Sequence, residues 1–310
     1  MKTNNIFYCI ICLVSILILI WSFLRNNLVE KFDIEDKVLY NRYRLREYAK
    51  NKKNLELIES KETFKNSNIP KVIHKVYIQN DGKIPKKLDK NIIDAHNSWI
   101  KMNPEYKIKY WSLDDCREYL QNNFPSNYLE TFDCIQAYSG KCNFFRYCII
   151  YNEGGWYSDW KQICLVDNLL NNISHSSRFV YFYDKGIPHT INNSCVQNAF
   201  FGTIPKHPIL QNAIKFVIEN VKNKYYGDFP LDTTGVCVFG KAIKEYNKKY
   251  NKIESQGEFN HKLAKGGQFY HKKLGKIIQH KCDKCGEGQS WKNGNNYNTL
   301  WDQRKYYCDD

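Results

Sequence analysis

The sequence predicts an α/β domain that begins near Ile69 and contains a mostly parallel central sheet. Between residues 71 and 121, strand-like and helix-like segments alternate, which is typical of the strand–helix units that build such a sheet. Between residues 139 and 164, a helix that is apolar on nearly every side is followed by two glycines and a short apolar strand. The chain has 310 residues, enough for one large domain with attachments, and we expect that domain over residues 69–310.

The elements outside the central stretch are predicted from the spacing of their apolar residues. Before it we expect strands at Lys71–Ile78 and Tyr106–Trp111 and helices at Ile92–Ile100 and Leu113–Gln121. After it we expect strands at Phe179–Tyr183 and near Val196–Phe201, a helix at Pro208–Lys222, and a further helix that follows Leu231–Gly235 and runs to Tyr250. His74 lies in the first strand, where a histidine is more often satisfied by the backbone than used as a ligand.

The central stretch, Ser139–Cys164, reads SGKCNFFRYCIIYNEGGWYSDWKQIC. Apolar residues at helical spacing cover most of its first half, so we expect a buried helix. The polar exceptions Ser139, Asn143 and Arg146 are spaced i, i+4, i+7 and therefore share one stripe of that helix.

The second half of the central stretch presents charged residues at a strand end. Gly154 and Gly155 should stop the helix, because glycine takes the left-handed conformation at no steric cost. The apolar pair Trp156-Tyr157 follows as a short strand, and Asp159 and Lys161 come directly after it. Ligands of open α/β sheets bind just beyond the carboxyl ends of strands, which is where this carboxylate is expected.

This stretch resembles the DXD region of glycosyltransferase family 32, which includes α-1,6-mannosyltransferases and α-1,4-galactosyltransferases. The family pattern reads roughly D-x-x-R-Y-x-x-L-Y-x-x-G-G-x-Y-x-D-x-D, and this chain has Asn143, Arg146, Tyr147, Ile150, Tyr151, Gly154, Gly155, Tyr157, Asp159 and Lys161 at those positions. Two earlier segments are also similar, Ile69–His74 to the opening I-P-K-x-I-H strand and Asn103–Tyr106 with Trp111 to an N-P-x-Y…W segment.

The resemblance implies a GT-A-like fold that binds a nucleotide-sugar donor and transfers a hexose, with retention, to a glycan or glycolipid acceptor. Carried over by position, the residues expected at the donor are His74, Asn143, Gly154, Gly155, Tyr157 and Asp159. Asp232 lies in a segment similar to the T-G-P region of the family, although Val236 replaces the proline. Asp232 and Asp302 are candidates for binding acceptor hydroxyls, and capping of a helix N-terminus is the alternative role of Asp232.

Two positions depart from the family pattern: Lys161 replaces the second aspartate of the DXD, and Asn143 replaces the helix aspartate. The usual site holds Mn²⁺ or Mg²⁺ through that second aspartate, and a lysine ammonium has no acceptor with which to ligate a cation. We therefore hypothesise that Asp159 binds donor hydroxyls while Lys161, helped by Arg146, supplies the positive charge of the metal. The alternatives are a metal held by Asp159 and another carboxylate such as Asp302, or an inactive glycan-binding relative.

The amino-terminal part predicts a membrane anchor ahead of the domain. Residues 1–5 form a short tail, and residues 6–24 contain no charge and are long enough to span a bilayer as a helix. Residues 25–68 are highly charged and read as a helical stem. A cleaved signal peptide is the alternative for the apolar segment, but no small-residue cleavage site follows it. We expect a single-pass type II protein of the endoplasmic reticulum or Golgi type, with the domain in the lumen.

The net charge of +14 suggests an anionic partner, such as a nucleotide, a phosphorylated glycan, a membrane surface or nucleic acid. The lysines are scattered among acidic residues, so most of this charge should be solvated surface. We expect no nucleic-acid partner, and a basic nucleic-acid-binding membrane protein is the least favoured class.

The 12 cysteines give one further candidate site. Cys282 and Cys285 form a C-x-x-C pair, and with His280 and Cys308 they provide four ligands that could hold zinc. Disulfides or free thiols are the alternative, because a second pair of zinc-ligand spacing is absent.

Overall fold

The computed structural model describes residues 68–80, 82–174, 177–185, 195–250, 252–261, 266–280 and 295–309. The predicted tail, the predicted anchor and all but the last residue of the predicted stem lie outside these ranges, as do Cys282 and Cys285. Among the described residues, none of the helices has the length and apolar composition needed to span a membrane.

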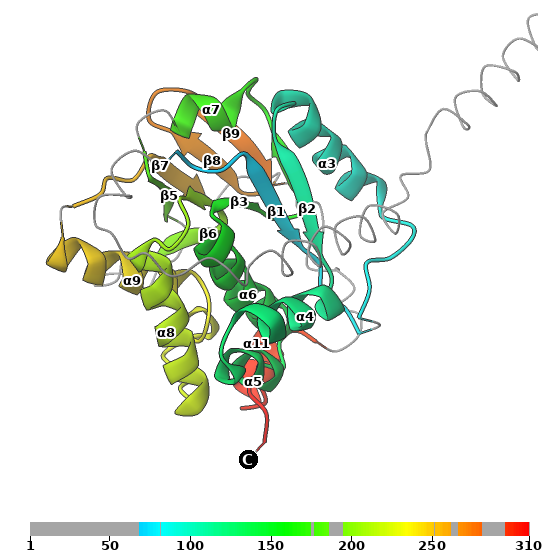
Figure 1. The fold of residues 1–310 in the computed structure, drawn as a ribbon, viewed down its shortest axis with the longest axis vertical. Coiled ribbons are helices and arrows are strands. Elements are labelled where there is room, and N and C mark those ends of the chain that lie inside the picture. Colours follow the sequence, from blue (N-terminus) through cyan, green and yellow to red (C-terminus); the bar gives the residue numbers. More distant parts are fainter. Residues whose placement is uncertain are drawn as a thin grey trace, which may run out of the picture.

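The described chain folds into a mixed α/β domain (Figure 1). Its strands are β1 (Val72–Val76), β2 (Lys107–Trp111), β3 (Gly155–Ser158), β4 (Gln162–Cys164), β5 (Phe179–Asp184), β6 (Val196–Thr203), β7 (Gly257–Asn260), β8 (Gln268–His271) and β9 (Gly275–His280). Its helices are α3 (Lys90–Met102), α4 (Leu113–Asn123), α5 (Ser126–Cys134), α6 (Tyr138–Glu153), α7 (Leu169–Ser174), α8 (Pro208–Lys222), α9 (Val236–Lys249) and α11 (Tyr297–Asp302), with a 3-10 turn η2 at Pro230–Asp232. The helices and strands predicted within the described residues are all present, with ends that differ by a few residues.

All the strands belong to one sheet with the order β2-β1-β3-β6-β5-β7-β8-β9-β4. Three neighbouring pairs are parallel, namely β1 with β2, β1 with β3, and β5 with β7, and the other five pairs are antiparallel. The prediction of a mostly parallel sheet is therefore wrong. The carboxyl-terminal half of the sheet is built largely from neighbouring strands joined without a helix, as in the turn at residues 272–274 between β8 and β9, and such connections give antiparallel pairs.

The sheet must curl, because β3 and β4 are close in the chain and far apart in the strand order. Six strand spacings of about 4.8 Å separate them along the sheet, about 29 Å if it were flat. The backbone from Ser158 to Gln162 can span at most about 14 Å. Curling therefore returns β4, and β9 beside it, toward the end of β3.

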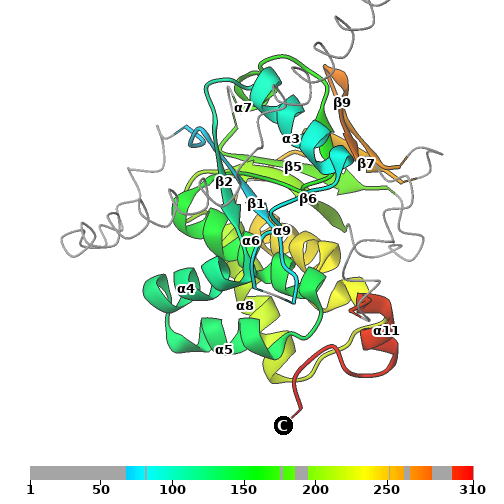
Figure 2. The ribbon, with the colours of Figure 1, turned by 90° about the vertical axis from the view of Figure 1, so that its right-hand side faces the viewer.

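Helices cover both faces of the sheet (Figures 1 and 2). Helices α4, α5, α6, α8 and α9 pack on one face, where the buried side chains form the larger core cluster. Helices α3 and α7 pack on the other face over a second cluster that includes Trp99, Trp156 and Phe200. Successive strand residues alternate between these clusters, since Trp156 belongs to the second and Tyr157 to the first.

Helix α6 is the predicted buried helix, and its aromatic and aliphatic residues from Phe144 to Ile150 are fully buried. It ends at two glycines with φ of 69° at Gly154 and 91° at Gly155. A Cβ added to Gly155 would lie 2.7 Å from the carbonyl oxygen of Val72. The Gly-Gly turn therefore allows β3 to leave α6 directly and pair closely with β1.

Within the described residues, two disulfides fix long-range contacts. Cys134, at the end of α5, pairs with Cys308 near the carboxyl terminus, and Cys195, just before β6, pairs with Cys237 in α9. The first brings the carboxyl-terminal segment against α5 and α6, where Ile135 and Tyr307 form an isolated β-bridge.

Candidate active site

The carboxyl ends of six strands share one edge of the sheet. Strands β1, β2 and β3 are mutually parallel, β3 and β5 are both antiparallel to β6, β7 is parallel to β5, and β9 runs the same way as β7 because both flank the reversed β8. Polar residues at or just beyond this edge are Asp159, Lys161, Asp184, Asn198, His261 and His280. The curl of the sheet closes this edge into one site around the end of β3.

Asp159 is held at this edge by its backbone and by its carboxylate. Its N–H donates to the carbonyl of Ala199 in β6 at 3.0 Å. Its Oδ1 accepts a hydrogen bond from the Tyr157 hydroxyl at 2.8 Å and forms an ion pair with Arg146 at 3.4 Å. The carboxylate side chain is 29% exposed. The predicted meeting of the α6 stripe with the end of β3 is thus confirmed.

Arg146 is buried, with 5% of its surface exposed. Its guanidinium donates to the carbonyls of Asn198 at 2.7 Å and Cys142 at 3.2 Å, and its Cζ lies 4.1 Å from the centre of the Tyr157 ring. Burial by itself would lower the pKa of Arg146, but Tyr157 and Asp159 reverse this, so its pKa is raised and it stays charged. This geometry does not fit the predicted role of Arg146 as a cation that shares the diphosphate, because its donors already hold Asp159 and β6.

Asn143 belongs to a network of neutral side chains that joins four parts of the chain. It donates to the Thr234 hydroxyl at 3.2 Å and accepts from Asn198 at 3.0 Å. Asn198 also donates to the Tyr147 hydroxyl at 2.8 Å, and Thr234 shares a hydrogen bond of 2.8 Å with the Tyr306 hydroxyl. Asn198 and Thr234 were missed from the sequence. The available signal was the polar pair Gln197-Asn198 at the start of an otherwise apolar strand.

Lys75 was also missed, although it lies directly beneath Asp159. It is fully buried in β1, and its Nζ donates to the Ser158 hydroxyl at 3.1 Å and the Asp159 carbonyl at 3.2 Å. Its Nζ lies 5.4 Å from the Trp99 ring centre. Desolvation lowers the pKa of Lys75 to about 7, against the opposing pull of Asp159 and Cys164. The signal in the sequence was a lysine inside an apolar strand, which is rarely buried without partners.

Lys161 lies in the turn between β3 and β4 and is partly exposed. It forms no hydrogen bond or ion pair with the residues that the structure describes. His280 lies opposite Gln162 in the β4–β9 pair. Burial lowers the pKa of His280, Asp159 opposes this, and the charges of Lys161 and His261 lower it further. The charges of Asp159, Lys161 and His261 therefore all act on His280.

Several residues predicted to bind the donor are placed inside the fold instead. His74 is fully buried, its Nδ1 accepts from the Trp111 indole at 3.1 Å, and burial holds its pKa well below the usual value. Tyr157 is 1% exposed, beneath the Arg146 guanidinium. Gly154 and Gly155 are buried at the amino end of β3, a whole strand away from Asp159. In this conformation these four residues shape the site rather than face a ligand.

Among the described residues, neither acceptor candidate forms a hydrogen bond or ion pair with the residues at this edge. Asp232 accepts from the backbone N–H groups of Asp228 at 3.0 Å and Phe229 at 3.4 Å, which is the turn-capping type of role left open by the sequence. Burial raises the pKa of Asp232. Asp302 is exposed at the end of α11, a helix that packs on α6 and η2.

The predicted zinc set loses one ligand. Cys308 is bonded to Cys134, so it has no free thiolate for a metal. Cys282 and Cys285 lie outside the described residues, and His280 is partly exposed at the end of β9.

The donor set at the edge does not fit a divalent cation. A second carboxylate is missing where Lys161 stands, and the carboxylate of Asp159 already binds Arg146 and Tyr157. Within the described part of the chain, no group of three or more His, Cys, Asp or Glu side chains is arranged to hold a metal ion. We therefore assign no step of the chemistry to a metal.

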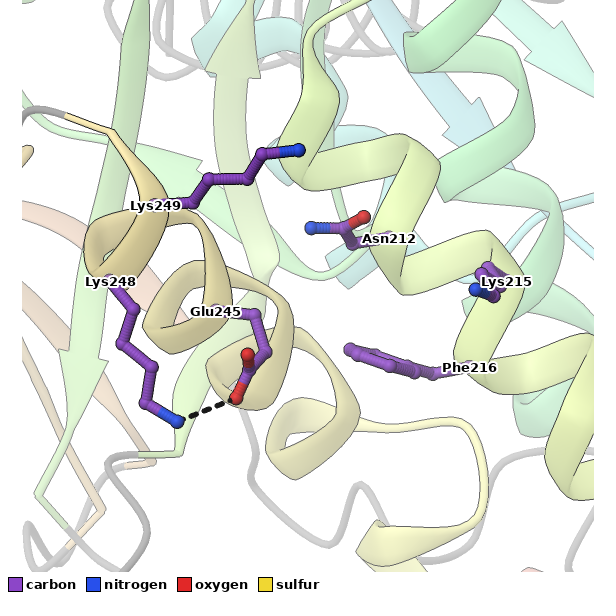
Figure 3. A pocket seen from close by; sticks show the side chains of 6 residues that line it. All are labelled: Asn212, Lys215, Phe216, Glu245, Lys248 and Lys249. Atoms are coloured by element: carbon purple, nitrogen blue, oxygen red, sulfur yellow. Dashed lines mark hydrogen bonds and ion pairs between the residues drawn. The ribbon is translucent and has the colours of Figure 1, made fainter.

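A groove of about 320 Å³ lies elsewhere, on the outer surfaces of α8 and α9 (Figure 3). Its lining comes from Asn212, Lys215, Phe216, Glu245, Lys248 and Lys249. It contains none of the residues at the sheet edge, and Glu245 in it is paired with Lys248 at 3.0 Å. The chemistry described above is therefore independent of this groove.

Comparisons with known proteins match a region of the chain that includes Arg146 and Asp159. Residues 89–180 match the glycosyltransferase sugar-binding region containing the DXD motif. The chain is 30% identical over 182 residues to the uncharacterized glycosyltransferase L373 of Acanthamoeba polyphaga mimivirus, covering 58% of this chain and 66% of the relative. It is 25% identical over 190 residues to the mannosyl phosphorylinositol ceramide synthase CSH1 of Saccharomyces cerevisiae, covering 60% of this chain and 46% of the relative.

A third relative is the inositol phosphoceramide mannosyltransferase 2 of Schizosaccharomyces pombe, 23% identical over 246 residues, with 76% of this chain and 62% of the relative covered. The chain thus spans two thirds or less of the length of each of these curated relatives. Among solved structures, the PaToxG glycosyltransferase is similar with a TM-score of 0.42 and 16% identity, covering 71% of this chain and 80% of that one.

The matched region and its relatives define a glycosyltransferase. More specifically, the chain belongs to the family of glycosyltransferases whose sugar-binding region contains the DXD motif.

Proposed function

We propose that this chain is a membrane-anchored transferase that moves a hexose from a nucleotide-sugar donor to a glycan or glycolipid acceptor, with retention, on a GT-A-like fold. The observation that carries the proposal is the placement of Asp159: a partly exposed carboxylate at the end of β3, held by Arg146 and Tyr157, inside the matched sugar-binding region. Two relatives are named as a mannosyl phosphorylinositol ceramide synthase and an inositol phosphoceramide mannosyltransferase, which supports mannose and an inositol phosphoceramide as the first pair to test.

In this proposal Asp159 binds the sugar donor through its hydroxyls, and Lys161 binds its diphosphate. The second oxygen of the Asp159 carboxylate accepts hydrogen bonds from hydroxyls of the donor. Lys161 directs its ammonium toward the diphosphate, where negative charge grows as the bond to the sugar breaks. Its partial exposure supports this assignment, whereas Arg146 acts behind Asp159 as a positioning residue.

The proposal is tested by incubating the full-length chain in detergent with GDP-mannose, UDP-glucose, UDP-galactose and UDP-N-acetylglucosamine, each with and without inositol phosphoceramide. Release of free nucleotide from one donor is expected, and Asp159→Asn should abolish it in a protein that still folds, with a lowered melting temperature because buried Arg146 loses its ion-pair partner. No release from any donor, despite a folded protein, would contradict a transferase.

A catalytically inactive glycan-binding relative is the second candidate function. Two observations favour this candidate. The ion pair with Arg146 neutralises the negative charge of Asp159, and the second acid is missing, so the site has less negative charge with which to bind a donor. This candidate predicts that calorimetry detects binding of oligosaccharide while none of the four donors is consumed.

We also propose that the domain resides in the lumen of the secretory pathway behind a type II anchor. The disulfides Cys134–Cys308 and Cys195–Cys237 support this, because such bonds persist in oxidising compartments. The full-length chain should then resist carbonate extraction from membranes. A mature chain that begins after about Leu24 would show instead that the apolar segment is a cleaved signal peptide.

A further inference from the structure

A histidine and a buried carboxylate meet at the same edge as Asp159. Asp184 is the last residue of β5, and His261 follows the last residue of the parallel strand β7. The His261 Nε2 lies 2.7 Å from the Asp184 Oδ1. The side chain of Asp184 is 1% exposed, whereas that of His261 is 44% exposed. The pair therefore has a buried acid and an imidazole that faces outward.

The carboxylate is held in place from behind. The Gln197 amide donates to Asp184 Oδ2 at 3.1 Å, and its oxygen accepts from the N–H of Ala199 at 3.1 Å. The Ala199 carbonyl in turn accepts from the N–H of Asp159. The same short segment of β6 thus positions both Asp184 and Asp159.

The hydrogen bond fixes the form of the imidazole. A carboxylate can only accept, so Nε2 of His261 carries the proton that is shared with Asp184. In the neutral ring, Nδ1 then holds a lone pair, and it forms no hydrogen bond with the described residues. The ring of Phe259 packs against the imidazole in an edge-on arrangement, with centres 4.5 Å apart, which limits its rotation.

His261 and Asp159 both follow strands whose carboxyl ends share this edge of the sheet. The charges of Asp159, Lys161 and His261 all act on the pKa of His280 at the end of β9. Lys185, just after β5, and Glu258 in β7 form an ion pair with each other.

We propose that His261, oriented by Asp184, is the general base that activates the acceptor hydroxyl; this inference rests on the proposed transferase function. The acceptor oxygen forms a bond to the anomeric carbon on the same face from which the diphosphate leaves, so that the configuration is retained, and its proton moves to Nδ1 of His261. The bond between that carbon and the diphosphate oxygen breaks, and its electron pair leaves with the diphosphate beside Lys161. The imidazolium is stabilised by Asp184 and then returns its proton to water.

The test compares His261→Gln with the wild type in the full-length chain, using GDP-mannose and inositol phosphoceramide first and then each other donor of the panel. General bases typically contribute 100-fold or more, so kcat should fall by about 100-fold or more. The dissociation constant of GDP or UDP, measured by calorimetry, should change less than about twofold because the base does not contact the nucleotide. The acidic limb of the kcat profile against pH should disappear. His261→Gly should regain part of the rate when free imidazole is added, which a purely structural role would not allow.

His271→Gln is the matched control, because His271 ends β8 at the opposite edge of the sheet and should leave kcat unchanged. Asp184→Asn should lower kcat in the same direction as His261→Gln. Wild-type kcat in His261→Gln, or a full acidic limb in it, would overturn the role of His261 while leaving the transferase standing. Failure of the wild type to consume any donor would overturn the proposed function, and this inference with it.

Discussion

Asp159 has a cation on each side of its peptide: the Arg146 guanidinium binds its carboxylate, and the Lys75 ammonium binds its backbone carbonyl. Both cations are buried, so they fix where the acid points and do not reach solvent. Lys161 is partly exposed, so its ammonium can bind the negative charge of a ligand. The local consequence is a carboxylate held in one orientation at the end of β3.

Lys75 makes a pH-dependent contribution to stability that can be measured. Its pKa is about 7 in the folded protein and 10.5 as an ordinary lysine. Between these values the unfolded chain binds a proton that the folded chain lacks, so folding becomes more favourable as pH rises. Relative to Lys75→Met, the unfolding free energy of the wild type should increase by up to about 5 kcal/mol from pH 7 to pH 10.5.

Urea unfolding of both proteins across that range checks this prediction. Comparison with Lys75→Met removes the contributions of the buried thiols and tyrosines, which titrate in both proteins. A difference between the two proteins that stays constant with pH would show that Lys75 keeps its ordinary pKa in the fold.

At the scale of elements, the turn between α6 and β3 sets the close approach of β3 to β1. Gly155 has a φ of 91°, and a Cβ there would meet the Val72 carbonyl oxygen at 2.7 Å. Gly155→Ala should therefore destabilise the fold by about 3 kcal/mol or more, from backbone strain and overpacking together.

Gly275 offers a matched control for that substitution. It has a φ of 68°, but a Cβ there would have nothing within 4 Å. Gly275→Ala should cost only the backbone strain, about 1 kcal/mol. Thermal melting of the two variants checks the difference, and equal losses would show that crowding at Gly155 is relieved by small movements.

The helices and strands could be predicted from local patterns, while their pairing could not. The apolar spacing of α6 and the glycines after it gave both its burial and the position of Asp159. β6 is antiparallel to β3 and β5, and this pairing depends on which strands lie beside it in the fold. The sequence of β6 itself does not indicate its neighbours. The sheet was therefore predicted to be mostly parallel although most of its pairs are antiparallel. The position of Asp159 at the carboxyl end of a strand was predicted correctly.

In the site too, residues close in sequence could be predicted to meet, and residues far apart in sequence could not. Asn143, Arg146 and Asp159 belong to one continuous stretch, so their meeting could be foreseen. Asp184 and His261 lie on separate strands, 77 residues apart, and nothing in their local sequence joins them. His74 and Tyr157 matched the family pattern, but the pattern does not tell a residue that binds a ligand from one that supports the site.

At the scale of the whole molecule, the carboxyl-terminal segment reaches back to the site. Cys308 is tied to Cys134 across 174 residues, and nearby Tyr306 binds Thr234, which binds Asn143. Loss of this link should loosen both the fold and the polar network of α6.

Cys308→Ser should lower the unfolding free energy by up to about 5 kcal/mol, since the disulfide closes a long loop in the unfolded chain. The measurement is thermal unfolding without reductant, and Cys134→Ser should give the same loss. The double variant Cys134→Ser/Cys308→Ser should be no worse than either single variant, because both remove one bond. Unchanged melting would show that the disulfide does not form in the folded protein.

The central claim is that Lys161 takes the place of a metal beside Asp159. A lysine near the diphosphate repels a second cation and supplies part of its charge, so the reaction should not need one. Lys161→Ala should lower kcat far more than it weakens acceptor binding, and Lys161→Asp should restore the metal-binding pair and make turnover depend on manganese.

The most direct measurement is nucleotide release by the wild-type full-length chain from its donor in excess EDTA, with and without added manganese. The account predicts that release continues in EDTA and that manganese stimulates it little. Complete inhibition by EDTA, restored by manganese, would contradict it and place a metal ion in the site.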